Sequence, residues 1–121
     1  MINKDIIREW VNELRSGRWK QGINMLNDGN GHYCCLGVLI EICIQSHKVK
    51  VEKHAGRDNI LYDGEDKFLP ASVYSFVGLD EMPAVRDGDY LSDLNDSKVS
   101  FDKIADLIEK KFLRKGKKNN G

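Results

Sequence analysis

The sequence has few prolines, no low-complexity tract and no excess of charge of either sign. Only two of its 121 residues are proline, which excludes a proline-rich linker or spacer. Its 19 basic residues balance its 19 acidic residues, so the overall charge gives no argument for nucleic acid as a partner. The longest apolar run is about half of what a membrane-crossing helix needs, and the N-terminus lacks a signal-peptide pattern. We expect one intracellular domain with no membrane partner.

Cysteine is also scarce, and the three cysteines lack the spacing of a disulfide framework or a metal site. Cys34 and Cys35 are adjacent, so a bridge between them would be strained, and no two cysteines form a C-x-x-C pair. Residues 28–30 and 87–89 are similar to parts of calcium loops but lack the later glutamate that such loops require. We interpret both as turns, and the sequence predicts no metal and no cofactor.

Cys34 and Cys35 begin an apolar segment, where a thiol is either a nucleophile or a core side chain. The dipole at a helix start would stabilise a thiolate, and the only candidate bases are His32, His47 and His54. No spacing brings an imidazole to a sulfur, and no oxyanion-hole sequence is evident. Because free cysteines commonly fill cores, we favour the core interpretation and predict no catalytic residue.

Hydrophobic periodicity predicts a helix-dominated α+β fold. Residues 3–16 and 101–113 each have one apolar face, with Asn3 and Ser100 as their N-caps and Gly17 at the left-handed position after the first. Residues 34–46 are instead apolar on nearly every side. The latter segment should therefore be a central helix that other elements cover. A short helix should begin near Pro70 and end at Gly78. The prediction is about four helices around a buried central helix, with a small antiparallel hairpin sheet.

Strand and loop signals lie between the predicted helices. Residues 48–53 alternate with period two and can pair with residues 59–62 as the hairpin. Residues 23–26 and 32–34 are short strand candidates around a strong turn signal. Residues 79–99 have little periodicity and predict a long loop, of the kind that is often functional.

Charge is distributed unevenly along the chain. Residues 110–118 contain no acidic residue, whereas residues 63–96 are rich in Asp and Glu. We assign residues 1–115 to a single globular domain and residues 116–121 to a frayed basic tail. The tail is either a solvated helix end favoured by the helix dipole or a surface for the acidic segment of a second copy, which would make a homo-oligomer. It has no aromatics near its last charges to stack on bases, which argues against nucleic acid.

A cluster around Arg18 has the chemistry of a ligand-binding surface. A guanidinium binds phosphate, an indole stacks on a base and an amide reads donors and acceptors, which points to Arg18, Trp19 and Gln21. Asn95 and Asp96 are placed to hydrogen-bond a ligand if the long loop closes over a pocket. Each residue also has a structural interpretation: Trp19 in the core, Arg18 paired with an acid, and Asn95–Asp96 as an Asx turn before a helix.

Several short motifs follow one another along most of the chain. They are Arg18-Trp19-x-Gln21-Gly22, Tyr33-Cys34-Cys35-Leu36-Gly37-Val38-Leu39, Leu69-Pro70, Gly78-Leu79, Leu91-x-x-Leu94-Asn95-Asp96 and Phe101-x-x-Ile104-Ala105-Asp106-x-Ile108-Glu109. In this order they resemble a small family of phage and prophage proteins, over roughly residues 15–110. The resemblance implies a viral setting, in the cytoplasm of a host cell, where short accessory proteins often interfere with host defence. It implies no particular activity.

Three functions of different classes follow. The favoured one is a non-enzymatic accessory protein that binds and sequesters a small phosphorylated, nucleotide-derived ligand, because the chain supplies Arg, aromatic and amide groups without a paired nucleophile and base. The second is an inhibitor that docks on a host protein through the hairpin edge or the acidic loop. The third is a small hydrolase that uses Cys34 or Cys35. Sequestration at nanomolar affinity corresponds to about −12 kcal/mol, which favours a closed pocket, for example one between subunits.

Overall fold

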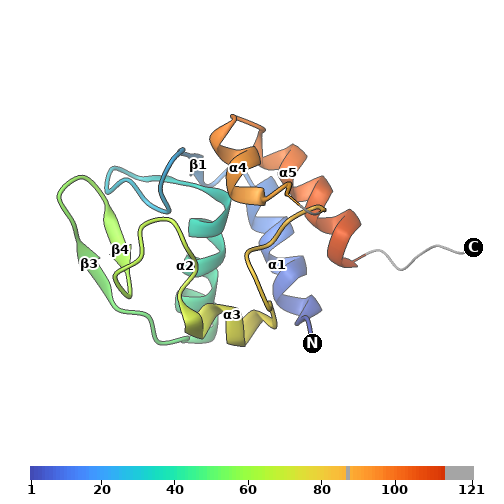
Figure 1. Ribbon diagram of the computed structural model, residues 1–121, viewed down its shortest axis with the longest axis horizontal. Coiled ribbons are helices and arrows are strands. Elements are labelled where there is room, and N and C mark those ends of the chain that lie inside the picture. Colours follow the sequence, from blue (N-terminus) through green and yellow to red (C-terminus); the bar gives the residue numbers. More distant parts are fainter. Residues whose placement is uncertain (87, 114–121) are drawn as a thin grey trace, which may run out of the picture.

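A buried central helix, α2 (Cys35–His47), organises the fold of the computed structural model, which describes residues 1–86 and 88–113. Every residue from 35 to 43 is buried, because a segment that is apolar on all sides has to be covered on all sides. The helices α1 (Lys4–Arg15), α3 (Ala71–Val77) and α4 (Leu91–Asp96) pack against it (Figure 1). The helix α5 (Phe101–Ile108) packs against α1 and α4. The predicted helix-dominated α+β fold is confirmed.

The first helix, α1, has the ends that the sequence predicts. Asn3 caps it by accepting a hydrogen bond from the Ile6 backbone N–H at 3.4 Å, and Gly17 follows it with a φ of +79°, a conformation that favours glycine. Its apolar face is buried, and the Trp10 indole N–H donates to the Cys35 carbonyl at 2.9 Å. This bond ties α1 to the first turn of α2.

The segment between α1 and α2 forms a parallel strand pair, whereas the sequence left open an irregular segment or a hairpin. Strand β1 (Lys20–Gln21) pairs with β2 (His32–Tyr33), and Lys20 lies opposite His32. The prediction of a strand over residues 23–26 is wrong. There the chain turns through Asn24 at a φ of +70°, and the Leu26 N–H bonds to the Asp66 carbonyl at 2.7 Å.

Leu26 also explains a glycine in the middle of the central helix. A Cβ built on Gly37 would lie 2.0 Å from the Leu26 carbonyl oxygen, which is backbone and cannot turn aside. That same carbonyl accepts the Cys34 N–H at 3.2 Å. Gly37 is therefore needed for close backbone approach, at the point where the loop before β2 crosses α2.

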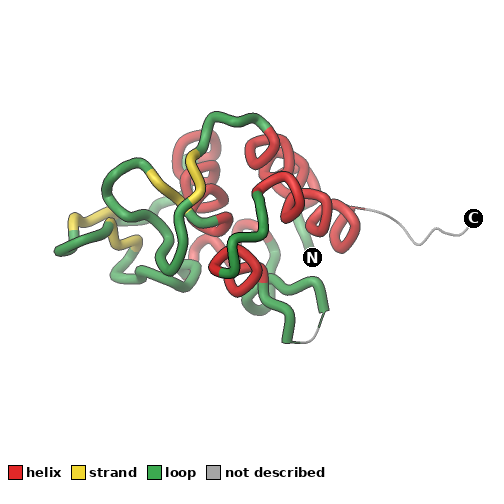
Figure 2. The backbone as a smooth tube through the Cα atoms, turned by 90° about the horizontal axis from the view of Figure 1, so that it is seen from above, coloured by secondary structure: helices red, strands yellow, loops and turns green. Residues whose placement is uncertain are grey.

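The predicted antiparallel hairpin is present but begins later in the sequence than expected. Strand β3 (Lys53–Ala55) pairs with β4 (Ile60–Tyr62), and the hairpin lies far from α5 in both views (Figure 2). Of residues 48–53, only Lys53 belongs to a strand. Val49 and Val51 instead pack on the core, so their alternation reflects burial against the core and not strand pairing.

The region 79–99, predicted as a loop, contains the helix α4. This helix has only six residues, too few for a periodic pattern. Its buried residues, Leu91 and Asn95, hold it against the core. Asn95–Asp96 accordingly ends a helix and is not the expected lead-in turn.

The last helix is shorter than predicted. Ser100 caps α5 by accepting the Lys103 N–H at 3.2 Å, as expected, but the α-helix ends at Ile108. The segment Glu109–Leu113 continues as a π-helical turn. The predicted domain end at 115 and the basic tail 116–121 lie outside the described residues. No helix of the described chain is both long and apolar enough to cross a membrane.

Candidate functional site

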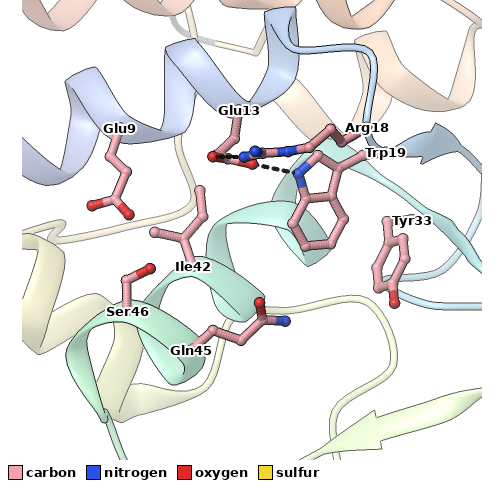
Figure 3. Close-up of a pocket in the computed structure, with 8 residues that line it drawn as sticks. All are labelled: Glu9, Glu13, Arg18, Trp19, Tyr33, Ile42, Gln45 and Ser46. Carbon is pink, nitrogen blue, oxygen red and sulfur yellow. Dashed lines mark hydrogen bonds and ion pairs between the residues drawn. The ribbon is translucent and has the colours of Figure 1, made fainter.

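An open cavity of about 460 Å³ lies between α1, the residues flanking β1 and β2, and the C-terminal half of α2 (Figure 3). The buried side chain of Ile42 forms its apolar floor. The remaining lining residues are aromatic, charged or polar, and they are Glu9, Glu13, Arg18, Trp19, Tyr33, Gln45 and Ser46.

Trp19 is the centre of the aromatic wall, and Glu13 holds it in place. The indole N–H donates to Glu13 Oε1 at 2.7 Å, and the ring meets Tyr33 edge to face at a centroid distance of 5.0 Å. Arg18 binds the other oxygen of Glu13. Trp19 is thus half-buried at the cavity and not a core plug, while its edge-to-face contact leaves ring surface beside the cavity.

Glu13 is an ionised acceptor in this arrangement. Burial by itself would raise the pKa of its carboxyl, but the hydrogen bonds from Arg18 and Trp19 outweigh that effect and lower the pKa. The Arg18 side chain remains 66% exposed. It can therefore leave Glu13 for another anion without exposing any core surface.

Gln21 and Asn95, two other predicted ligand contacts, instead bind each other. The Gln21 side-chain amide donates to Asn95 Oδ1 at 3.0 Å and to the Val99 carbonyl at 2.8 Å. Asn95 Oδ1 also accepts the Cys35 N–H at 3.1 Å, and Asn95 Nδ2 donates to the Gly22 carbonyl at 2.8 Å. These bonds join β1, α2 and α4, so both amides are used in holding the fold together.

Asp96 lies apart from both groups. Its carboxylate accepts the Asn24 backbone N–H at 2.7 Å, and it borders a different depression, of about 250 Å³, beside Cys34 and Phe68. Of the five predicted contacts, the structure brings only Arg18 and Trp19 to one cavity. The lining residues that the sequence did not indicate are Glu9, Glu13, Tyr33, Ile42, Gln45 and Ser46. The spacing of four between Glu9 and Glu13 shows that they share a helix face, but not which element that face meets.

A buried polar network supports the cavity from behind. Glu41, 1% exposed, accepts hydrogen bonds from Tyr62 Oη at 2.6 Å and Gln45 Nε2 at 2.9 Å, and pairs with Lys53 Nζ at 2.7 Å. Asn27 donates to Tyr62 Oη at 2.9 Å. The network connects the β3–β4 hairpin to α2 and reaches the cavity through Gln45.

A family model for a domain of unknown function, DUF8296, matches residues 2–112. The chain belongs to the DUF8296 family. No curated protein and no solved structure matches it. The match spans every α-helix and both strand pairs of the fold, and it includes the whole cavity lining.

The cysteines of this DUF8296 domain are free, buried thiols. Burial raises the pKa of Cys34 to about 11 and that of Cys43 to about 12, and it raises the pKa of Cys35 well above the ordinary value. Each imidazole contacts a carboxylate: His32 with Asp28, His47 with Glu9, and His54 with Glu52. Within residues 1–86 and 88–113, no group of three or more His, Cys, Asp and Glu side chains is arranged to hold a metal ion.

We expect the thiols of the native DUF8296 domain to resist alkylation. With a pKa of about 11, roughly one Cys34 in a thousand is a thiolate at pH 8, and burial blocks access as well. Iodoacetamide at pH 8, followed by intact-mass measurement, should leave the native protein unmodified and should label all three cysteines in guanidinium. Rapid labelling of native Cys34 or Cys35 would restore the nucleophile interpretation.

Proposed function

We propose that this protein is a non-enzymatic viral accessory protein that binds, and thereby sequesters, a small nucleotide-derived ligand in the 460 Å³ cavity. The observation that carries the proposal is the convergence of Arg18, Trp19 and Tyr33 on that one cavity. A cation and two aromatic rings are the groups that a phosphorylated, base-containing ligand needs. The cavity volume also falls within the range of small-molecule sites.

Arg18 supplies the contact for the phosphate. Its guanidinium is at the rim of the cavity and is paired with Glu13 through one nitrogen, Nη2. A phosphate carries more charge than a carboxylate and accepts two parallel N–H bonds from the guanidinium. Because Arg18 is largely exposed, exchanging Glu13 for a phosphate requires only a side-chain rotation.

The chemistry of the cysteines supports a binder over an enzyme. All three thiols are in the core, and their raised pKa values oppose formation of the thiolate that a hydrolase would need. None of them lines the 460 Å³ cavity.

A depletion-and-release assay tests the proposal. Excess protein is mixed with a panel of nucleotides and cyclic dinucleotides and filtered, and the retained fraction is then heated. Both fractions are read by mass spectrometry. We expect a compound that disappears from the filtrate and returns intact on heating. A compound that returns altered would indicate an enzyme, and a filtrate that keeps every compound would remove the support for the cavity as a nucleotide site.

Arg18→Ala should weaken binding of the retained compound by about 1.5–3 kcal/mol, the value of charged hydrogen bonds, or roughly tenfold or more. Isothermal titration of both proteins measures the difference. Arg8→Ala is the matched control, because Arg8 is an exposed arginine of α1 that pairs with Asp5 away from the cavity. Unchanged affinity in folded Arg18→Ala would remove Arg18 from the site.

A docking inhibitor of a host protein is the second candidate. The observation in its favour is that all three residues of β3 are exposed, so an extended segment of a partner can approach this strand. It predicts that no nucleotide is retained in the assay and that a host protein forms a stable complex with the chain. A second copy of the chain is a further partner to test, by mass measurement in solution.

A further inference from the structure

At the end away from Arg18, the cavity that we propose as the nucleotide site offers hydrogen-bond acceptors from Glu9 and Gln45 to a ligand. Glu9 points its carboxylate into the space at the end away from Arg18 (Figure 3). One of its oxygens, Oε1, contacts His47 Nε2 at 2.7 Å. The other, Oε2, has no hydrogen bond to any residue in the described parts of the chain. A carboxylate oxygen accepts hydrogen bonds and does not donate them.

Gln45 adds a second acceptor, and its orientation is set by Glu41. The Gln45 amide nitrogen donates to Glu41 Oε1 at 2.9 Å, which turns the amide oxygen toward the cavity (Figure 3). The reverse orientation would place two oxygens against each other, since an ionised carboxylate only accepts. Lys53 and Tyr62 bind the other oxygen of Glu41 and keep the carboxyl ionised.

The charges of the lining determine how a nucleotide is oriented in the cavity. Glu9 and Glu13 outnumber the single cation, Arg18, which lies on the other side of the site from Glu9. A phosphate would be repelled near Glu9 and attracted at Arg18. We therefore place the phosphate at Arg18 and the base beside Trp19, toward Glu9 and Gln45.

We propose that the end of the cavity away from Arg18 recognises a guanine-type base, with Glu9 and the Gln45 amide oxygen accepting hydrogen bonds from its N1–H and 2-amino groups. The inference rests on the proposed function and names the ligand class of that same site. Guanine presents two adjacent donor groups on this edge, whereas adenine presents one donor next to the acceptor N1, which would face a carboxylate or carbonyl oxygen. An acceptor facing an acceptor forms no hydrogen bond with it and repels it, so adenine lacks a contact that guanine makes at the same place. The Ser46 hydroxyl, which also lines the cavity, is a donor for the guanine carbonyl O6.

In this arrangement Glu41 is a positioning residue. It makes no contact with the ligand, but it holds the Gln45 amide in the orientation that accepts. Replacing Glu41 with glutamine lets residue 41 donate as well as accept, so that Gln45 can turn either way. The expected consequence is a loss of base selectivity, which a purely structural role for Glu41 would not produce.

The test is a titration of the wild-type protein with GMP, IMP and AMP and with the corresponding cyclic dinucleotides. We expect guanine compounds to bind at least about ten times more tightly than adenine compounds. This difference in affinity corresponds to the free energy of one donor–acceptor mismatch. Inosine compounds, which lack the 2-amino group, should fall between them. Gln45→Met keeps the length of the side chain and removes the acceptor, so it should lower guanine affinity and leave adenine affinity nearly unchanged. Glu41→Gln should lower the guanine-to-adenine ratio in protein that circular dichroism shows to be folded, although loss of the Lys53 ion pair lowers its melting temperature.

The outcomes separate this inference from the function on which it rests. Equal binding of guanine and adenine compounds would overturn the guanine assignment and leave the nucleotide site standing. Preserved selectivity in Gln45→Met would overturn the role of Gln45. Failure of every nucleotide in the panel to bind would overturn the proposed function and the guanine assignment together. Asn12→Ala, an exposed change on α1 outside the lining, is the control and should alter none of these values.

Discussion

Asn95→Ala should lower the free energy of unfolding by about 3–5 kcal/mol, since each buried polar group left without a partner costs about 1–3 kcal/mol. The Asn95 side chain is fully buried and bonds to three partners: Gln21, the Cys35 N–H and the Gly22 carbonyl. The Cys35 N–H belongs to the first turn of α2, where no carbonyl of the helix is available to it. Urea unfolding followed by circular dichroism measures the loss.

Asp93→Ala is the control for this change. Asp93 is an exposed residue of the same helix, α4, and its removal should alter stability by about 0.5 kcal/mol or less. Gln21→Ala and the double variant complete the test. Because the Gln21–Asn95 hydrogen bond is lost in either single variant, the double variant should cost clearly less than the sum of the two. Strict additivity, or a loss below about 1 kcal/mol in Asn95→Ala, would show that Asn95 does not hold β1, α2 and α4 together.

Lys53→Met should cost about 2–4 kcal/mol at pH 7, because it leaves the Glu41 carboxylate buried without its counter-charge. The cost falls below that of a fully buried pair, since the Lys53 side chain is 42% exposed whereas that of Glu41 is 2% exposed. The pKa of Glu41 makes the effect dependent on pH. Burial would raise this pKa above its ordinary value of 4.5, but hydrogen bonds to the carboxylate, the one from Lys53 first among them, lower it.

A group with a lowered pKa stabilises the folded state above its unfolded pKa, and this contribution is lost as the pH falls through the folded value. The difference between wild type and Lys53→Met should therefore be largest near pH 7 and should shrink below the ordinary value of 4.5. Urea unfolding at pH 7 and at pH 3 measures both. Lys50→Met is the control, because Lys50 is exposed and forms no ion pair within residues 1–86 and 88–113. A difference that stays constant with pH would mean that Lys53 contributes through packing and not through charge.

Only part of the candidate site could be predicted from the sequence, and the packing of the helices explains why. Arg18 and Trp19 could be recognised because their side chains have a chemistry that few positions share. Gln21 has equally suitable chemistry, yet its side-chain amide donates a hydrogen bond to Asn95, which lies 74 positions away in the sequence. Glu9 and Gln45 carry no motif at all. They enter the cavity only because α1 packs on α2 and because Glu41 orients the Gln45 amide.

Features that depend on neighbours along the chain could be predicted from the amino-acid sequence. The all-apolar segment that became α2, the Asn3 and Ser100 caps and the glycine ends of α1 and α3 are of this kind, since burial tendency, capping and φ are properties of single residues or one turn. Tertiary structure alone decided the helix α4, the parallel pairing of β1 with β2, the late start of β3, the Asn95 and Glu41 networks and the cavity. Each of these depends on groups far apart in the sequence, whose hydrogen bonds and burial exist only after the helices have packed.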